Sequence, residues 1–114
     1  MKLYFRELGK GKPMIILHGL FGFSDNWQTL ATKFSEFFRV ILIDFRNHGH
    51  SPWSDDFSYD LMVDDLKELI DDLNLENIFL VISLNSLFKL FKIESLSSLK
   101  LLSFSLWFSN IKLY

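Results

Sequence analysis

The chain has 114 residues, of which 49% are hydrophobic, and its formal net charge at pH 7 is −2. This length suits one domain with an ordinary core, and a weakly acidic chain without a basic stripe is not expected to bind nucleic acid. The absence of cysteine excludes disulfides, thiolate catalysis and cysteine-based zinc sites. Because the sequence has no apolar run of about 18 residues and charges interrupt its first residues, we expect a cytoplasmic protein without a membrane partner.

The first patterned segments predict strand, strand, helix. Residues 2–8 alternate apolar and polar side chains, as an edge strand does, and the glycines and proline of residues 9–13 indicate a turn. The continuous apolar run 14–17 predicts a strand buried on both faces of a parallel sheet. A helix is expected to start at Asp25, which with Gln28 fits a capping box. Its apolar face at helical spacing comprises Trp27, Leu30, Ala31, Phe34 and Phe38.

The next segments repeat this order. Residues 39–44 predict a second buried strand, residues 44–52 a polar loop, and residues 78–82 a third buried strand. Between them, a helix is expected to be capped by Ser58 and to end at Asn74. Its buried stripe is Met62, Leu66, Leu69, Ile70 and Leu73, and its solvated faces carry Asp60, Asp64, Asp65, Asp71 and Asp72. Strands that alternate with helices in this way predict a doubly wound α/β sheet.

Two polar motifs follow the first two buried strands. His18-Gly19-Leu20-Phe21-Gly22 is a glycine-flanked turn at a strand end, where backbone N–H groups can bind an oxyanion; the alternative is an ordinary strand-to-helix turn. The second motif is Asp44-Phe45-Arg46-Asn47-His48-Gly49-His50-Ser51. With Asp25-Asn26-Trp27 between them, these motifs resemble the α/β-hydrolase superfamily, in particular the small YbfF-type esterases, over residues 2–82. The resemblance implies a partial α/β-hydrolase fold, with a mostly parallel sheet, helices on both faces, and truncation before the later strands.

The resemblance also implies a role for individual residues. The Leu20 N–H would be one donor of the oxyanion hole, with Phe21 as the alternate, and the Leu84 N–H would be the second donor. Ser83 stands at the position of the nucleophile. The residues expected to brace the site are His18, Gly19, Asp44, Arg46, Asn47, His48, Gly49 and Ser51. The implied substrate is a small-molecule ester or thioester of a small acyl group, and neither a metal nor an organic cofactor is implied.

The sequence departs from the family pattern around Ser83. Val81 and Asn85 occupy the places of the glycines in a G-x-S-x-G elbow, and their Cβ atoms are expected to obstruct that strained turn. The family places its acid and its histidine after the nucleophile, but Glu94 is the only acid there and no histidine follows Ser83. A serine without a base is a poor nucleophile at neutral pH, so we expect this chain to be inactive.

The composition changes at the same point, which divides the chain into residues 1–82 and a tail, 83–114. All five glycines lie at or before Gly49, and 21 of the 32 tail residues are Ser, Leu or Phe. One hypothesis is a lost reading frame or a decayed gene; the other is a genuine divergent tail that packs on the sheet. The functional alternatives to a serine hydrolase are a non-catalytic module that binds a small ligand, and a non-functional fragment that self-associates through an open sheet edge.

Overall fold

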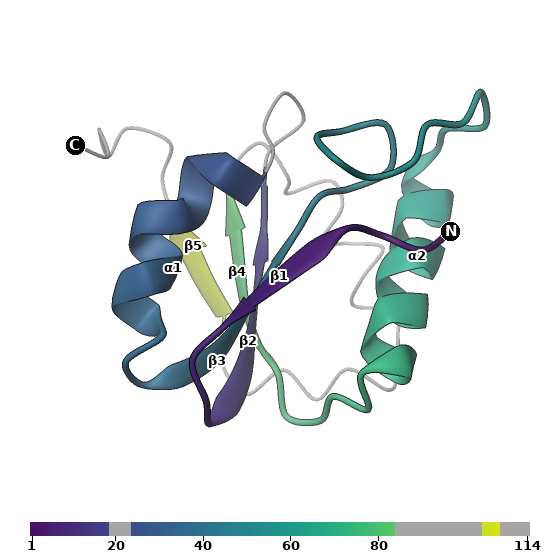
Figure 1. Cartoon of the computed structure of the whole chain (residues 1–114). Coiled ribbons are helices and arrows are strands. Elements are labelled where there is room, and N and C mark those ends of the chain that lie inside the picture. Colours follow the sequence, from purple (N-terminus) through teal and green to yellow (C-terminus); the bar gives the residue numbers. More distant parts are fainter. Residues whose placement is uncertain (19–23, 84–103, 108–114) are drawn as a thin grey trace.

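A five-stranded sheet organises the chain (Figure 1). The computed structural model describes residues 1–18, 24–83 and 104–107, and only the backbone of residues 82, 83 and 104–107. The strands are β1 (Phe5–Leu8), β2 (Lys12–Leu17), β3 (Phe38–Ile43), β4 (Phe79–Ser83) and β5 (Phe104–Trp107). Their order across the sheet is β1-β3-β2-β4-β5; β1 pairs antiparallel with β3, and every other neighbouring pair is parallel. The predicted mostly parallel α/β sheet is confirmed.

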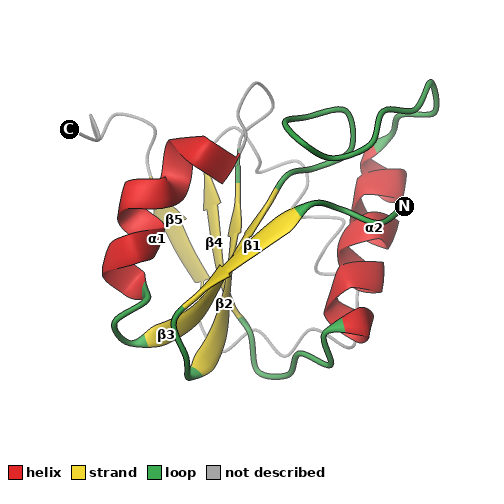
Figure 2. Ribbon diagram, in the orientation of Figure 1, coloured by secondary structure: helices red, strands yellow, loops and turns green. Residues whose placement is uncertain are grey.

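Helices cover both faces of this sheet (Figure 2). A 3₁₀ turn, η1 (Ser24–Trp27), leads into α1 (Gln28–Phe34) on one face, and α2 (Tyr59–Asp72) lies on the other. Side chains alternate along β2, so Met14 and Ile16 face α1 whereas Ile15 and Leu17 face α2. The α1-side core consists of Met14, Ile16, Ala31, Val40, Leu42 and Val81, with Trp27 and Phe34 packed against it. Burial on both faces explains why the central strands read as continuous apolar runs.

The first helix differs from its prediction. The predicted capping box is wrong: the N-cap of α1 is Trp27, whose side chain makes no capping hydrogen bond, while Asp25 forms an ion pair with Arg6 on β1, 2.8 Å away. Phe38 is wrong as a helix residue, because the chain turns after Phe34 and Phe38 begins β3. Its ring still packs against Phe34 at 6.5 Å between centroids, so the apolar period continued across the turn.

The two ends of the second helix follow their prediction. The Ser58 hydroxyl accepts a hydrogen bond from the Leu61 N–H at 3.1 Å, which makes Ser58 the N-cap of α2. After the last helical residue, Asn74 takes a left-handed conformation with φ of 51°, and the Leu75 N–H donates to the Ile70 carbonyl oxygen at 3.1 Å. These bonds close a Schellman motif, so the helix stops where the sequence predicted.

The tail contributes one strand to the described part of the chain. In β5, Leu106 lies beside Ile82 of β4 in a parallel ladder. The other tail residues, 84–103 and 108–114, lie outside the described ranges, and both hypotheses for the origin of the tail stay predictions. No helix within the described ranges has both the length and the apolar character needed to cross a membrane.

Candidate active site

The sequence-predicted residues His18, Asp44 and Ser83 stand at the carboxyl ends of β2, β3 and β4. The parallel register pairs Leu17 with Ile82, so His18 and Ser83 follow at neighbouring positions at the ends of β2 and β4. The β2–β3 register pairs Ile16 with Leu42, and the same offset brings Asp44 level with His18. In open α/β sheets, ligands bind outside this edge, which makes it the candidate site.

His18 is fully buried and acts as a hydrogen-bond acceptor. Its Nε2 accepts the backbone N–H of Phe45 at 3.0 Å, and its ring lies edge-on to the Phe45 ring with the centroids 5.1 Å apart. A nitrogen that accepts this bond carries no proton. Its lone pair is directed at the N–H of Phe45, just after the end of β3. This geometry fits a bracing residue and does not fit a general base.

Asp44 holds two chain segments with one carboxylate. Its Oδ1 accepts the Ser24 N–H at 2.6 Å, and its Oδ2 accepts the His50 N–H at 3.0 Å. Gly49 allows the loop to pass this close to the Asp44 carboxylate. It has φ of +48°, and a Cβ there would lie 2.4 Å from Asp44 Oδ2. The Asp44 carbonyl oxygen accepts the Ser51 hydroxyl, whose oxygen in turn accepts the Tyr4 N–H at 2.8 Å.

These hydrogen bonds set the ionisation of Asp44. Burial alone would raise its pKa, but hydrogen bonds from the backbone N–H groups of His50 and Ser24 and from the Ser24 hydroxyl outweigh burial. The pKa of Asp44 therefore falls below its ordinary value of 3.8. Asp44 is a buried carboxylate at neutral pH, stabilised by the groups that it holds in place.

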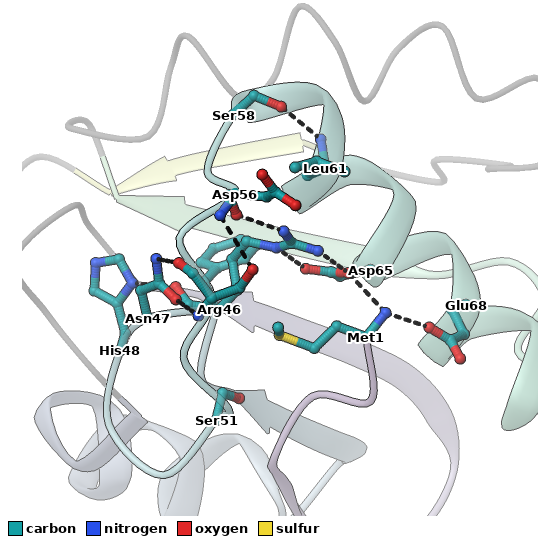
Figure 3. Close-up of polar contacts among 12 residues, drawn as sticks. Met1, Arg46, Asn47, His48, Ser51, Asp56, Ser58, Leu61, Asp65 and Glu68 are labelled. Carbon is teal, nitrogen blue, oxygen red and sulfur yellow. Dashed lines mark hydrogen bonds and ion pairs between the residues drawn. The ribbon is translucent and has the colours of Figure 1, made fainter.

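Arg46 joins the same loop to α2 (Figure 3). Its guanidinium donates to both carboxylate oxygens of Asp65, at 2.6 and 2.9 Å, and to the Asp56 carbonyl oxygen at 2.8 Å. Beyond Asp65, the Met1 ammonium lies 3.1 Å from Asp65 Oδ1 and donates to Glu68 at 2.9 Å. The prediction that Asp65 lies on a solvated face is wrong: only 1% of its side chain is exposed.

The outer part of the loop is held by side-chain-to-backbone bonds. Asn47 has φ of 62°; its side-chain amide donates to the Ser54 carbonyl oxygen at 2.9 Å and accepts the Ser54 N–H at 2.7 Å. The His48 Nδ1 lies 2.8 Å from the Arg46 carbonyl oxygen, which only accepts, so the proton is on Nδ1. The His48 ring is 5.0 Å from the His18 ring between centroids. The residues of the second motif thus form one braced loop.

The site is described only in part. Gly19, Leu20, Phe21 and Leu84 lie outside the described residues, so their predicted roles stay predictions. The backbone of Ser83 closes β4, and two residues earlier Val81 is buried in the α1-side core with 3% exposure. Within the ranges that the structure describes, no group of three or more His, Cys, Asp or Glu side chains could hold a metal ion.

Sequence reasoning missed three residues that support the site: Ser24, Arg6 and Asp65. The Ser24 N–H meets Asp44, and the Ser24 hydroxyl accepts from Arg6 on β1 at 2.9 Å. Ser24 is 20 residues from Asp44, and Asp65 is 19 residues from Arg46. The sequence offered one general signal: a buried polar or acidic side chain, such as Ser24 two residues after the first motif or Asp65 among apolar helix positions, requires a partner.

The comparisons with known proteins agree on the family. The model of the α/β-hydrolase fold matches residues 12–83. A Haemophilus influenzae protein assigned as an esterase or lipase is 44% identical over 68 residues, which is 60% of this chain and 24% of that protein. The Escherichia coli esterase YbfF is 39% identical over 59 residues, or 52% of this chain and 23% of that enzyme.

Solved structures give the same result. An esterase from a marine microorganism is 49% identical with a TM-score of 0.68, covering 70% of this chain and 31% of that one. A thermophilic esterase from Thermogutta terrifontis has a TM-score of 0.76 at 26% identity, covering 82% of this chain and 35% of that one. The chain thus spans about a quarter of the length of the curated relatives it matches, and these relatives extend beyond the matched region.

Proposed function

Because the chain belongs to the α/β-hydrolase family, as its family match and relatives show, we propose that it carries the oxyanion-hole side of a serine esterase. The substrate class is a carboxylic ester or thioester with a small acyl group. Ser83 stands at the nucleophile position, and the Leu20 and Leu84 N–H groups are the oxyanion donors, with Phe21 as the alternate to Leu20.

The adjacency of His18 and Ser83 carries this proposal. The end of β2 begins the first motif, and the β2–β4 register brings that end beside the end of β4. A donor segment and a nucleophile must meet in this way for one carbonyl group to reach both. The buried hydrogen bonds of His18 and Asp44 support the proposal, because they hold His18 and Ser24, the described residues on either side of the donor segment in the sequence.

The proposed chemistry is acyl transfer in two steps. The Ser83 Oγ attacks the carbonyl carbon while a base takes its proton, and the N–H donors stabilise the negative oxygen. The alcohol or thiol leaves with that proton, and water then cleaves the acyl-serine to release the acid and restore Ser83. Each preorganised donor contributes about 3 kcal/mol to the transition state.

The base is the missing part. All three histidines precede Ser83, and the Nε2 of His18 already accepts the Phe45 N–H. We therefore propose that the 114-residue chain alone does not turn over ester substrate, and that it needs an acid and a histidine from outside this sequence. A non-catalytic binding module is the second candidate, because the bracing of the edge is present without an identified base.

The test combines labelling with turnover. The chain and its Ser83→Ala variant are incubated with a fluorophosphonate probe and assayed with p-nitrophenyl acetate. We expect equal rates for the two proteins; labelling at Ser83 indicates a formed elbow, whereas a cooperatively melting but unlabelled chain favours the binding module. An insoluble chain favours the self-associating fragment. A rate that disappears in Ser83→Ala contradicts the inactivity proposal and directs attention to His48, whose Nδ1 proton is fixed by Arg46.

A further inference from the structure

A short exposed segment before α2 is held at three alternate residues. The Pro52 carbonyl oxygen accepts the Asn47 N–H at 3.1 Å, and the Asn47 side chain makes two hydrogen bonds to the backbone of Ser54. The Asp56 carbonyl oxygen accepts from the Arg46 guanidinium at 2.8 Å (Figure 3). The segment is thus fixed at every second residue to the loop that follows β3.

Trp53 and Asp55, the two residues between these anchors, are exposed. The exposed fraction of Trp53 is 77%. Together with Ser54, the two residues line an open hollow of about 300 Å³. A side chain this exposed contributes little to core packing, so stability does not explain a tryptophan at this position. Because its backbone is already fixed, it loses little further freedom when a ligand binds, which suits a recognition site.

The charge of this part of the chain favours a cationic ligand. Within the described ranges, no hydrogen bond or ion pair reaches the Asp55 carboxylate. Residues 51–65 contain five aspartates and no lysine, arginine or histidine. One of them, Asp65, is neutralised by two hydrogen bonds from Arg46 at 2.6 and 2.9 Å. The segment that lines the hollow therefore keeps an excess of negative charge, which attracts a cation and repels an anion.

The residues of the hollow select among cations. A Ca²⁺ or Mg²⁺ ion needs about six oxygen ligands, whereas the hollow offers one carboxylate, one hydroxyl and one indole. An organic cation can use the carboxylate and the indole together, because the ring face attracts its charge and the carboxylate accepts its N–H groups. A guanidinium group suits this pair better than an ammonium group, since it is planar, weakly hydrated and able to stack on an aromatic face.

We propose that Trp53 and Asp55 form a binding site for a guanidinium group, presented by an arginine side chain of a partner polypeptide. The cation stacks on the Trp53 indole, and its N–H groups donate to the Asp55 carboxylate. Free arginine suits the site less well, because its own carboxylate would approach a negatively charged segment. The exposed rings of Phe57 and Tyr59, with exposures of 44% and 38%, offer apolar contacts to residues that flank an arginine in a polypeptide. Ser83 takes no part in this site, so the inference does not depend on the proposed esterase function.

The first experiment compares three small probes on the parent chain. N-acetyl-arginine amide, N-acetyl-lysine amide and the uncharged, equally shaped N-acetyl-citrulline amide are titrated in. The indole N–H signal of Trp53 and the backbone amide signal of Asp55 report binding. We expect the arginine probe to shift both signals and to bind about tenfold more tightly than the citrulline probe, because loss of the charge weakens both contacts. No shift with the arginine probe, or equal affinity for the lysine or citrulline probe, overturns the proposal.

Variants test the two side chains separately. Trp53→Ala and Asp55→Asn should each weaken binding of the arginine probe about fivefold. Phe37→Ala and Glu36→Gln are the matched controls, because they change an exposed ring and an exposed acid in the turn after α1. Both controls should bind as the parent does, and thermal unfolding checks that all four variants are folded, as expected for exposed positions. Affinity in Trp53→Ala or Asp55→Asn that equals the affinity of its control overturns the proposal.

The last comparison distinguishes a polypeptide from the free amino acid. The peptide acetyl-Phe-Arg-Phe-amide and free L-arginine are titrated into the parent chain under the same conditions. We expect the peptide to bind about fivefold more tightly or better, because it lacks the repelled carboxylate and adds apolar contacts. Free arginine that binds as tightly as the peptide overturns the assignment of the ligand to a polypeptide.

Discussion

The chain leaves β3 and β4 at the same edge of the sheet, but the two exits are built differently. After β3, the buried polar residues Asp44, Arg46 and Ser51 bind backbone groups and charges from η1, from α2 and from the residue before β1. In β4, the last described side chain before the nucleophile position in the sequence is Val81, which packs in the α1-side core. Polar bracing and apolar packing thus lie on opposite sides of β2 in the sheet.

This difference separates two requirements of a hydrolase site. Bracing demands particular polar side chains at fixed spacing, and the second motif retains all of them. An elbow demands small residues, because the backbone around the nucleophile is strained and lies close to the following helix. At position 81 a valine contributes packing that a glycine could not. Val81 of β4 therefore contributes to core packing, while the residues after β3 contribute polar bracing.

The largest expected effect comes from breaking the brace after β3. Arg46→Ala leaves the Asp65 carboxylate buried without its bidentate partner and should destabilise the fold by about 3–5 kcal/mol. Urea unfolding measures the loss, with Asp64→Ala as the exposed control on the same helix. A double variant, Arg46→Met with Asp65→Leu, should recover most of it, since the buried charge is then removed together with its partner. An Arg46→Ala variant as stable as its control would show that the pair does not hold the loop.

The next effect tests the other exit. Val81→Gly removes a side chain with 3% exposure from the α1-side core and adds backbone freedom, so we expect a loss of about 2–4 kcal/mol. Val81→Ala should lie between Val81→Gly and the parent in thermal unfolding. Relief of elbow strain works in the opposite direction. A Val81→Gly variant that melts at or above the parent temperature would mean that strain at β4 outweighs core packing.

Acid should act on the β3 exit through Asp44. Its pKa is lowered in the folded chain, so its contribution is complete above the ordinary value of 3.8 and is lost as pH falls through the folded value. Urea midpoints between pH 7 and pH 3 should therefore fall less steeply in Asp44→Asn than in the parent. Glu68 is an exposed carboxylate with which the buried Asp44 can be compared. Hydrogen bonds from Lys2 and the Met1 ammonium lower the pKa of Glu68 to about 2. Parallel pH profiles of the parent and Asp44→Asn would contradict this assignment.

The contrast between the exits also shows what the sequence could predict. Local signals were reliable: the apolar runs located β2, β3 and β4, and Ser58 was identified as a cap from its place before an apolar period. Asp65 was misassigned because a helical pattern gives only neighbours along the helix, whereas its partner Arg46 is 19 residues away in a loop. The capping box failed for a related reason, since Asp25 pairs with Arg6 across the sheet edge. The spacing of residues along the sequence does not predict which charged side chains pair over long range.

The smallest effect should come from the outer part of the β3 loop. Asn47→Gly removes two hydrogen bonds to Ser54 but places glycine at a φ of 62°, where it is not strained, so we expect a loss below about 1 kcal/mol. Asn47→Ala loses the same bonds and keeps a Cβ in the left-handed region, which adds about 1 kcal/mol. Urea midpoints of the two variants separate these contributions, because they differ only in backbone preference. If Asn47→Gly is as damaging as Arg46→Ala, the loop is held at its outer turn, and the buried charges beneath it are not the main brace of this exit.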